Sequence, residues 1–474
     1  MFKRILIANR GEIAVRIIRA CQELDIETVA VYSEADANAL HVQLADLSYP
    51  IGPSDAAESY LNMDAILRAA RETGADAIHP GYGFLSENAD FADMVTKAGL
   101  TWIGPLAVTI RQVGDKDVAR AAMEPSGIPM AKGSEPLTDY EMAMESAKEV
   151  GYPVILKPVS GGGGKGMFVA HNAKELTDIL NVVDLEKTKF YFEHYIERSR
   201  HIEVQIVADN YGSIIHLGER ECSLQRRNQK LLEESPSIAL TDAMREEVGL
   251  LAIKAAKSVH YTNIGTVEFL LDLSNNQFYF MEINPRIQVE HGITEAVTGI
   301  DLVRTQIKIA AGEPLEISQK DVVFRGHAIE CRINAEDPDK NFMPSPGKIT
   351  KWHEPGGPRV RFDSGFTSDL SIEPYYDSLI AKIITRGRTR GDAIKIMARA
   401  LKEFQVEGVK TTIALHQRIL EDDFFRTGNI DTQFVKNRLQ VYETTPSKRS
   451  LKELKTFAAK INEINYENLL SLIN

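Results

Sequence analysis

The sequence predicts a multidomain protein that combines α/β and α+β architecture. Its 474 residues exceed the length that one hydrophobic core usually organises, so about two to four domains are expected. Strand-like and helix-like patterns alternate at the amino terminus, whereas later strand-like runs are joined directly by short turns. The alternation predicts a doubly wound parallel sheet, and the directly joined strands predict antiparallel hairpins further along the chain.

The composition is that of a globular protein and argues against general nucleic-acid binding. Hydrophobic residues make up 43% and charged residues 26% of the chain. A formal net charge of −12 means that any cations needed to bind phosphate must be concentrated locally. No apolar run is long enough to span a membrane. Cys21, Cys222 and Cys331 form no Cys-x-x-Cys pair, which is typical of reduced thiols in a cytoplasmic protein.

The amino-terminal region repeats a strand, helix, strand pattern. "RILIA", "GEIAVRIIRACQEL" and "ETVAVY" form the first repeat, and "DAIHPGYGFLSENADFADMVTKAGLTWIGP" follows the same scheme. Residues 1–111 are therefore expected to form a parallel sheet with helices on both faces. The first turn, "ANRGEIA", lacks the G-x-G-x-x-G spacing, which disfavours a nicotinamide site.

A glycine-rich loop follows in "YPVILKPVSGGGGKGMFV", between a strand that ends at Lys157 and another strand. Four consecutive glycines cost entropy to order, but they allow backbone N–H groups to approach phosphates closely. The spacing differs from the G-x-x-x-x-G-K-[ST] phosphate loop. We interpret this segment as a mobile flap that covers ATP.

A predicted hairpin places two carboxylates opposite each other. "GTVEFLLDLSNNQFYFMEIN" contains two β-rich runs around a Ser-Asn-Asn turn. A turn centred near Asn275 puts Glu268 opposite Glu282, and directly opposed like charges destabilise a sheet. Mg²⁺ removes that repulsion, with Asn284 as a third oxygen ligand on the same face. The alternative is an ordinary strand with one polar face.

The polar pattern continues beyond this hairpin in "NPRIQVEH". Because side chains alternate along an extended chain, Arg286, Gln288 and Glu290 are expected on the same side as Glu282. This extended polar row predicts a site for charged substrates.

A second predicted hairpin, "RHIEVQIVADNYGSIIHLGER", leads into a basic segment. Arg226, Arg227 and Lys230 follow the end of its second strand. We expect these cations to converge on the polar row and hold a small anion. The alternative is a solvated basic turn.

The chain resembles biotin carboxylase, the ATP-grasp component of biotin-dependent carboxylases, from residue 1 to about residue 440. The stretches that carry the resemblance include "ILIANRGEIAVRIIRAC", "AIHPGYGFLSENADFA", "GYPVILKPVSGGGGKGM", "ERECSLQRRNQK", "EINPRIQVEH", "GHAIECRINAEDP" and "YYDSLIAKII". The resemblance implies a biotin carboxylase N-terminal domain over 1–111, an ATP-grasp domain over 112–330 with a mobile lid at about 131–196, a C-terminal biotin carboxylase domain over 331–440, and a helical tail over 441–474.

The resemblance also implies roles for individual residues. Those that would bind the ATP phosphates, lie in the flap, or surround adenine and ribose are Lys116, Lys157, Gly163, Gly164, Glu193, Tyr195, His201 and Glu203. Those that match the metal site, for Mg²⁺ or Mn²⁺, are Glu268, Glu282 and Asn284.

Those that would hold bicarbonate are Lys230, Arg286, Gln288 and Val289. Glu290 would be the base that deprotonates bicarbonate, and Arg332 would bind bicarbonate and biotin.

Two positions depart from the family pattern. Asn228 lies near the expected nucleotide site where the family usually has histidine, which predicts altered nucleotide affinity and pH dependence. Gly292 replaces the usual proline after "VEH", which predicts a looser loop around Glu290.

The chain has no "MKM"-type biotin-acceptor site, so we expect biotin to arrive on a separate biotin carrier or carboxyltransferase subunit. The chain most resembles the biotin carboxylase chain of two-subunit pyruvate carboxylases, with the corresponding chain of an acetyl-CoA or propionyl-CoA carboxylase as the alternative. The family commonly dimerises, which predicts a homodimer. Another ATP-grasp ligase and a catalytically silent nucleotide-binding regulator are the remote alternatives. Intact "RIQVEH" and "ECRINAED" motifs disfavour the first, and the presence of Glu268, Glu282 and Glu290 disfavours the second.

Overall fold

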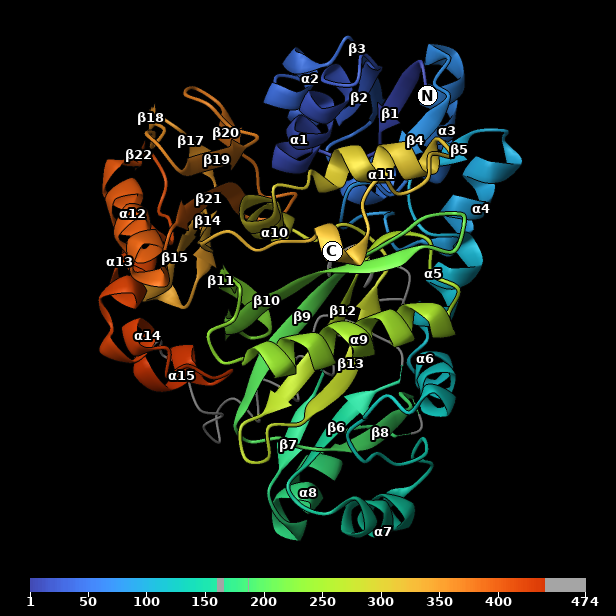
Figure 1. Cartoon of the computed structure of the whole chain (residues 1–474), viewed down its shortest axis with the longest axis vertical. Coiled ribbons are helices and arrows are strands. Elements are labelled where there is room, and N and C mark those ends of the chain that lie inside the picture. The colour runs from blue at the N-terminus through green and yellow to red at the C-terminus, as the bar shows by residue number, and fades with distance from the viewer. Residues whose placement is uncertain (160–165, 186, 440–474) are drawn as a thin grey trace.

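The amino-terminal residues form a five-stranded parallel sheet in the order β3-β2-β1-β4-β5. The computed structural model describes residues 1–159, 166–185 and 187–439 (Figure 1). Along β1, Ile5 and Ile7 belong to one buried cluster and Leu6 to another, so both faces of the sheet are covered as predicted. The elements are β1 (Arg4–Ile7), α1 (Gly11–Gln22), β2 (Glu27–Ser33), α2 (Leu40–Leu44), β3 (Leu47–Gly52), α3 (Met63–Thr73), β4 (Ala77–His79), α4 (Ala89–Lys97), β5 (Thr101–Trp102) and α5 (Ala107–Gly114).

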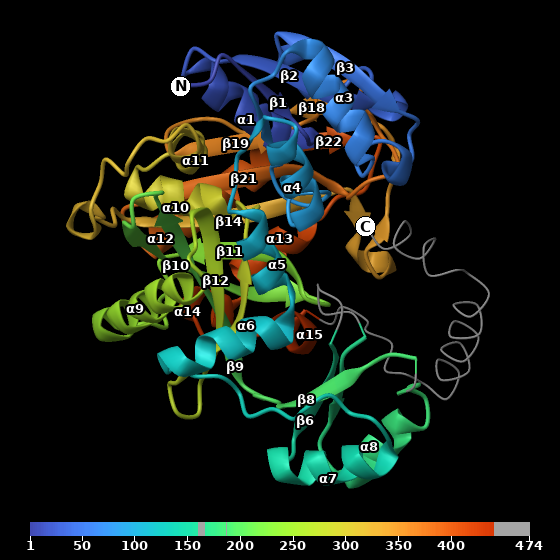
Figure 2. The same cartoon turned by 90° about the vertical axis from the view of Figure 1, so that its right-hand side faces the viewer.

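A smaller unit follows α6 (Lys116–Met123) and has a hydrophobic core of its own. Its three antiparallel strands lie in the order β7-β6-β8. In Figure 2 this unit lies at the opposite end of the molecule from the amino-terminal sheet. Its elements are α7 (Tyr140–Val150), β6 (Val154–Pro158), β7 (Phe168–Ala170), α8 (Ala173–Leu180) and β8 (Phe190–His194).

The centre of the molecule is an eight-stranded antiparallel sheet in the order β13-β12-β9-β10-β11-β14-β21-β19. Both predicted hairpins are part of this sheet and are confirmed. The strands are β9 (Ser199–Ala208), β10 (Ile214–Arg226), β11 (Gln229–Ser235), β12 (Asn263–Asp272), β13 (Phe278–Asn284), β14 (His327–Asn334), β19 (Val360–Ser364) and β21 (Leu379–Gly387). The helices that follow its strands are α9 (Asp242–Ser258), α10 (His291–Thr298) and α11 (Leu302–Ala310).

The carboxyl-terminal residues complete this sheet and pack helices against it. Their short strands are β15 (Glu336–Asp337), β16 (Met343–Pro344), β17 (Gly347–Lys348), β18 (Lys351–His353), β20 (Ser371–Ile372) and β22 (Gln405–Glu407). Their helices are α12 (Arg390–Glu403), α13 (Ile413–Glu421), α14 (Asp423–Thr427) and α15 (Phe434–Arg438). The predicted helical tail over 441–474 lies outside the described residues. In the described part of the chain, each helix is too short or too polar to cross a bilayer.

Candidate functional site

A row of four charged side chains crosses the central sheet. Glu282 on β13 lies opposite Glu268 on β12, as the hairpin predicts. Glu268 in turn lies opposite Glu203 on β9, which lies opposite Arg220 on β10. Residues directly opposite one another share a face of the sheet, so three carboxylates and one guanidinium form a continuous row.

Lys230 on β11 holds three carboxylates at once. Its Nζ lies 2.5 Å from Glu203 Oε2, 3.0 Å from Glu268 Oε1 and 2.7 Å from Glu290 Oε1. Burial alone would lower the pKa of Lys230, but these carboxylates outweigh burial and raise it well above its usual value. Lys230 therefore stays charged and joins the row on the strands to Glu290 at the start of α10.

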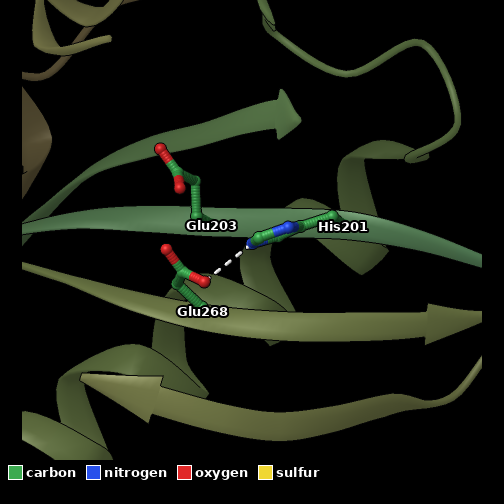
Figure 3. A group of neighbouring side chains, drawn as sticks. All are labelled: His201, Glu203 and Glu268. Atoms are coloured by element: carbon green, nitrogen blue, oxygen red, sulfur yellow. Dashed lines mark ion pairs between the residues drawn. The ribbon is translucent and has the colours of Figure 1, made fainter. Parts of the chain in front are cut away.

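His201 on β9 and Glu268 on β12 face each other between their strands, and Glu203 lies beside them on β9 (Figure 3). The His201 Nε2 atom lies 2.9 Å from Glu268 Oε2, at ion-pair distance but without hydrogen-bond geometry. Burial alone would lower the pKa of His201, but the Glu268 carboxylate outweighs burial, so the pKa is raised. These three residues have donor atoms close enough for a metal. Lys230 already neutralises both of their carboxylates, which argues against an ion here.

The predicted metal ligands Glu268, Glu282 and Asn284 suit Mg²⁺ better. Among the described residues, the Glu282 carboxylate has no hydrogen-bond or ion-pair partner. Burial and then the charge of Glu268 raise its pKa, as expected for a carboxylate that lacks a neutralising cation. Asn284 Nδ2 donates to Glu268 Oε1 at 2.9 Å, which brings its side-chain amide beside the Glu268 carboxylate. Carboxylate and amide oxygens are ligands for Mg²⁺, so the donor set fits the predicted ion.

Glu290 lies between two cations in the buried interior. Besides its contact with Lys230, its Oε2 lies 2.9 Å from an Nη atom of Arg332 on β14. Burial would raise the pKa of Glu290, but Lys230 and Arg332 together hold it well below its usual range. Arg332 also donates from Nε to Glu233 Oε1 at 2.6 Å. The predicted base, anion ligand and biotin ligand are thus in one network.

The segment after Asn284 corrects one sequence expectation. The strand ends at Asn284, and residues 285–289 do not pair with a neighbouring strand. Pro285 lacks an N–H group and so cannot continue the hydrogen-bonding pattern. Gln288 still reaches the row, with its Nε2 3.4 Å from Glu268 Oε1. The polar row is therefore completed by a loop and a helix start, not by strand alternation.

Arg286 joins the site to the amino-terminal domain. Its Nε donates to Glu87 Oε1 at 2.8 Å, and one Nη donates to Gln288 Oε1 at 2.9 Å. Sequence reasoning missed Glu87, although it lies within the quoted stretch "AIHPGYGFLSENADFA". A polar residue in a loop gives no local sign of a partner 199 positions away.

Val289 lies beside another buried cation that the sequence analysis did not assign. The Nζ of Lys382 on β21 donates to the Val289 carbonyl at 2.7 Å and lies 3.0 Å from Glu12 Oε1 on α1. The only sequence signal was one lysine inside the apolar run "LIAKII". A fully buried lysine in such a run needs a carboxylate from elsewhere in the fold.

Another group of predicted nucleotide ligands lies on the small unit with β6 and β8. Lys157 Nζ is 2.5 Å from Glu193 Oε2, and Arg120 lies 3.1 Å from Glu193 Oε1. Burial would raise the pKa of Glu193, but these cations lower it. Burial and the charge of Lys157 lower the pKa of Lys116 against the opposing effect of Glu282. Lys116 thus connects this group electrostatically with the metal ligands.

The remaining predicted nucleotide residues lie in different surroundings. Tyr195 accepts a hydrogen bond from Gln433 Nε2 at 3.1 Å, while His201 and Glu203 belong to the row on the central sheet. Gly163 and Gly164 lie outside the described residues.

The expected convergence of three cations is wrong for two of them. Arg226 donates to Asn341 Oδ1 at 2.6 Å and stacks on Phe342, and Arg227 also reaches Asn341. Only Lys230 joins the charged row. Arg227 and Asn228 form the two-residue turn between β10 and β11, with φ of 49° and 65°. That turn directs Arg227 away from the row and suits asparagine at position 228.

Gly292 also differs from expectation, because it lies in the first turn of α10 and not in a loose loop. It is buried, and a Cβ atom there would collide with the end of the Ile384 side chain. Gly292 therefore packs closely against β21.

The fold and this site define an ATP-dependent ligase of the ATP-grasp class. Family models for the biotin carboxylase N-terminal domain, the carbamoyl-phosphate synthase L chain ATP-binding domain and the biotin carboxylase C-terminal domain match residues 1–110, 115–318 and 330–437. The chain belongs to the biotin carboxylase family.

Similar proteins support this membership along nearly the whole chain. Biotin carboxylase 1 of Bacillus subtilis is 56% identical over 442 residues, covering 92% of this chain and 98% of that protein. The A-type subunit of pyruvate carboxylase from Methanothermobacter thermautotrophicus is 50% identical, covering 92% and 90%. A solved biotin carboxylase domain dimer of Hydrogenobacter thermophilus 2-oxoglutarate carboxylase, in complex with MgADP, ADP and bicarbonate, has a TM-score of 0.88 at 47% identity, covering 94% and 99%.

Proposed function

We propose that this chain uses ATP and bicarbonate to carboxylate biotin carried by a separate protein. The observation that carries the proposal is the contact of Glu290 with both Lys230 and Arg332, next to the Glu268 and Glu282 pair. This arrangement combines a carboxylate base, cations for an oxyanion, and ligands for a nucleotide-bound metal ion. The complex of the Hydrogenobacter domain with MgADP and bicarbonate supports the same substrates here.

On the nucleotide side, Lys116 and Lys157 would bind the phosphates, and Glu268, Glu282 and Asn284 would hold Mg²⁺ or Mn²⁺. The cation would neutralise charge on the phosphates during phosphoryl transfer. Phosphate oxygens would compete with Glu193 for Lys157, which frees the ammonium group from its present ion pair. Gly163 and Gly164 stay predicted residues of the flap.

On the bicarbonate side, Lys230, Arg286, Gln288 and Val289 would position the anion, and Glu290 would accept its proton. The low pKa of Glu290 makes it a weak base while Lys230 and Arg332 hold it. Bicarbonate that takes hydrogen bonds from these two cations would weaken their hold on Glu290 and make it more basic. Substrate binding would therefore activate the base.

The deprotonated bicarbonate would attack the γ-phosphoryl group to form carboxyphosphate and ADP. Carboxyphosphate would release CO₂ and phosphate beside biotin, the phosphate would take the biotin N1 proton, and the resulting enolate would attack CO₂. Arg332 would stabilise the enolate oxygen, because its guanidinium keeps its charge and remains anchored to Glu233.

Glu290→Ala and Arg286→Ala should abolish most biotin carboxylation while the fold survives. Without Glu290, Lys230 still contacts Glu203 and Glu268, and Arg332 still contacts Glu233. The assay is ATP hydrolysis with Mg²⁺ and bicarbonate, with and without free biotin, and the control is Glu247→Ala on the exposed side of α9. Normal biotin-stimulated hydrolysis in either site variant would refute the assignment. If biotin does not stimulate ATP hydrolysis by the native chain, the chain would instead be another ATP-grasp ligase.

We further propose pyruvate as the final carboxyl acceptor, with oxaloacetate as the product. The 50% identity to a pyruvate carboxylase chain from Methanothermobacter supports this choice, and an acyl-CoA is the alternative acceptor. The chain, reconstituted with its carboxyltransferase partner and labelled bicarbonate, should label oxaloacetate from pyruvate. Label in malonyl-CoA or methylmalonyl-CoA instead would identify the alternative.

The proposed assembly is a homodimer that works with a biotin carrier or carboxyltransferase subunit. The dimeric Hydrogenobacter domain supports the homodimer. A cytoplasmic location stays a prediction from the isolated cysteines.

A further inference from the structure

Four arginines line one pocket at the edge of the central sheet, away from the site described above. The pocket has a volume of about 320 Å³ and is lined by Arg325, Gly326, Arg359, Arg386, Gly387 and Arg388. We call it the arginine pocket. Its lining consists of four arginines and two glycines, and it contains no carboxylate.

The backbone forces these arginines together. Gly326 and Gly387 lie on adjacent strand ends, because His327 pairs with Gly387 where β14 and β21 meet. A Cβ atom on Gly326 would collide with the Gly387 carbonyl oxygen, so Gly326 is needed for this close approach. The backbone N–H of Arg386 donates to the Arg359 carbonyl at 3.1 Å. This hydrogen bond holds the segment that carries Arg359 against β21.

The local charge is not neutralised within the protein. Among the residues that the structure describes, none of the four guanidinium groups has a hydrogen-bond or ion-pair partner. All four arginines are exposed, in a chain whose net charge is −12. Like charges this close repel one another unless an anion lies between them. Arg359 also has a positive φ of 67°, a costly backbone conformation for a residue other than glycine.

We propose that the arginine pocket binds a small phosphate-type anion. Guanidinium forks match the oxygens of phosphate and keep their charge at any physiological pH. The volume admits a compact ligand, and several cations around one small body favour a group that carries more than one negative charge. An acidic segment of a second copy of the chain is the competing occupant.

This site is separate from the proposed active site. Arg325 precedes the first residue of β14, whereas Arg332 lies near the other end of that strand. At the rise of an extended strand, the seven steps between them span about 23 Å. Phosphate bound in the arginine pocket would therefore not contact Lys230, Glu290 or the metal ligands.

The test is calorimetric titration of inorganic phosphate into the full chain in chloride buffer, with the nucleotide site filled by Mg²⁺ and a non-hydrolysable ATP analogue. The native chain should show saturable binding, and R386Q/R388Q should weaken it about tenfold or more, because each lost guanidinium removes charge-assisted hydrogen bonds. The control R68Q/R71Q removes the same charge from exposed positions on α3 and should bind phosphate like the native chain.

Two results would overturn the proposal. The first is equal phosphate binding by the native chain, R386Q/R388Q and the control. The second is loss of self-association in R386Q/R388Q, by sedimentation, without any change in phosphate affinity, which would assign the arginines to an interface between copies. Biotin-stimulated ATP hydrolysis by R386Q/R388Q should stay at the native level in buffer without added phosphate, so failure here is distinct from failure of the proposed function.

Discussion

At the scale of single residues, the site depends on cations that each hold more than one buried carboxylate. Lys230 contacts Glu203, Glu268 and Glu290, and Arg332 contacts Glu290 and Glu233. A buried carboxylate is tolerated when a cation compensates for its lost hydration. The same sharing makes the site sensitive to the loss of one cation.

Lys230→Met should lower the free energy of unfolding by about 3–5 kcal/mol, because it leaves buried carboxylates without their shared cation. Urea denaturation of the native chain and the variant measures this difference. Lys254→Met on α9, where the lysine is exposed, should change stability little. Equal destabilisation by the two substitutions would contradict the role assigned to Lys230.

Glu233 predicts a pH dependence of stability. Burial raises its pKa from 4.5 to about 7, despite the opposing charge of Arg332. Between these values the folded chain binds this proton more tightly than the unfolded chain, so Glu233 makes stability fall as pH rises from about 4.5 to about 7. Glu233→Gln keeps an acceptor for Arg332 and removes the titration.

The gain in stability of Glu233→Gln over the native chain should therefore grow as pH rises across this window. Urea denaturation at intervals between about pH 5 and pH 8 measures it. The control is Glu247→Gln on α9, where the glutamate is exposed. A difference between Glu233→Gln and the native chain that does not change with pH would show that Glu233 does not titrate there.

At the scale of elements, the β6-β7-β8 unit has its own core, separate from the central sheet. Leu156, Leu176 and Phe192 are buried in one cluster with helices α7 and α8. A unit with its own core can open without the rest of the chain, which is the property that a lid requires. We propose that this unit closes over ATP.

Phe192→Ala should destabilise this unit by about 3–5 kcal/mol through the cavity that it leaves. Hydrogen exchange should accelerate in α7, α8 and β6, while β9 and β12 keep native protection. The KM for ATP should rise. A matched change in the central core, Phe269→Ala, should instead accelerate exchange in β9 and β12. Uniform acceleration in the Phe192 variant would contradict an independent unit.

At the scale of the whole molecule, one sheet and a few ion pairs join the parts of the chain. β11 pairs with β14, so the central sheet continues across the expected boundary at residue 330. Lys382 joins Glu12 of the amino-terminal domain to the loop of Val289, and Arg286 reaches Glu87. The site is thus assembled from all three regions.

Lys382→Met should weaken bicarbonate binding as well as stability. The substitution leaves Glu12 buried without its cation and releases the Val289 carbonyl, so the loop of predicted bicarbonate ligands loses an anchor. We expect a higher KM for bicarbonate with a smaller change in the KM for ATP, measured by steady-state hydrolysis. Lys395→Met on α12, where the lysine is exposed, is the control. Equal rises in both KM values would indicate general loss of structure.

The sequence by itself determined the parallel amino-terminal sheet, the two hairpins and the opposition of Glu268 and Glu282. These features depend on spacing along the chain, because helix and strand periods are local. The tertiary structure alone decided that Arg226 turns away to Asn341, and that Glu87 and Lys382 complete the site. It also gathered the four arginines of the pocket from three separate segments. Such contacts join residues far apart in sequence. They are selected by packing between elements, which leaves no local pattern in the sequence.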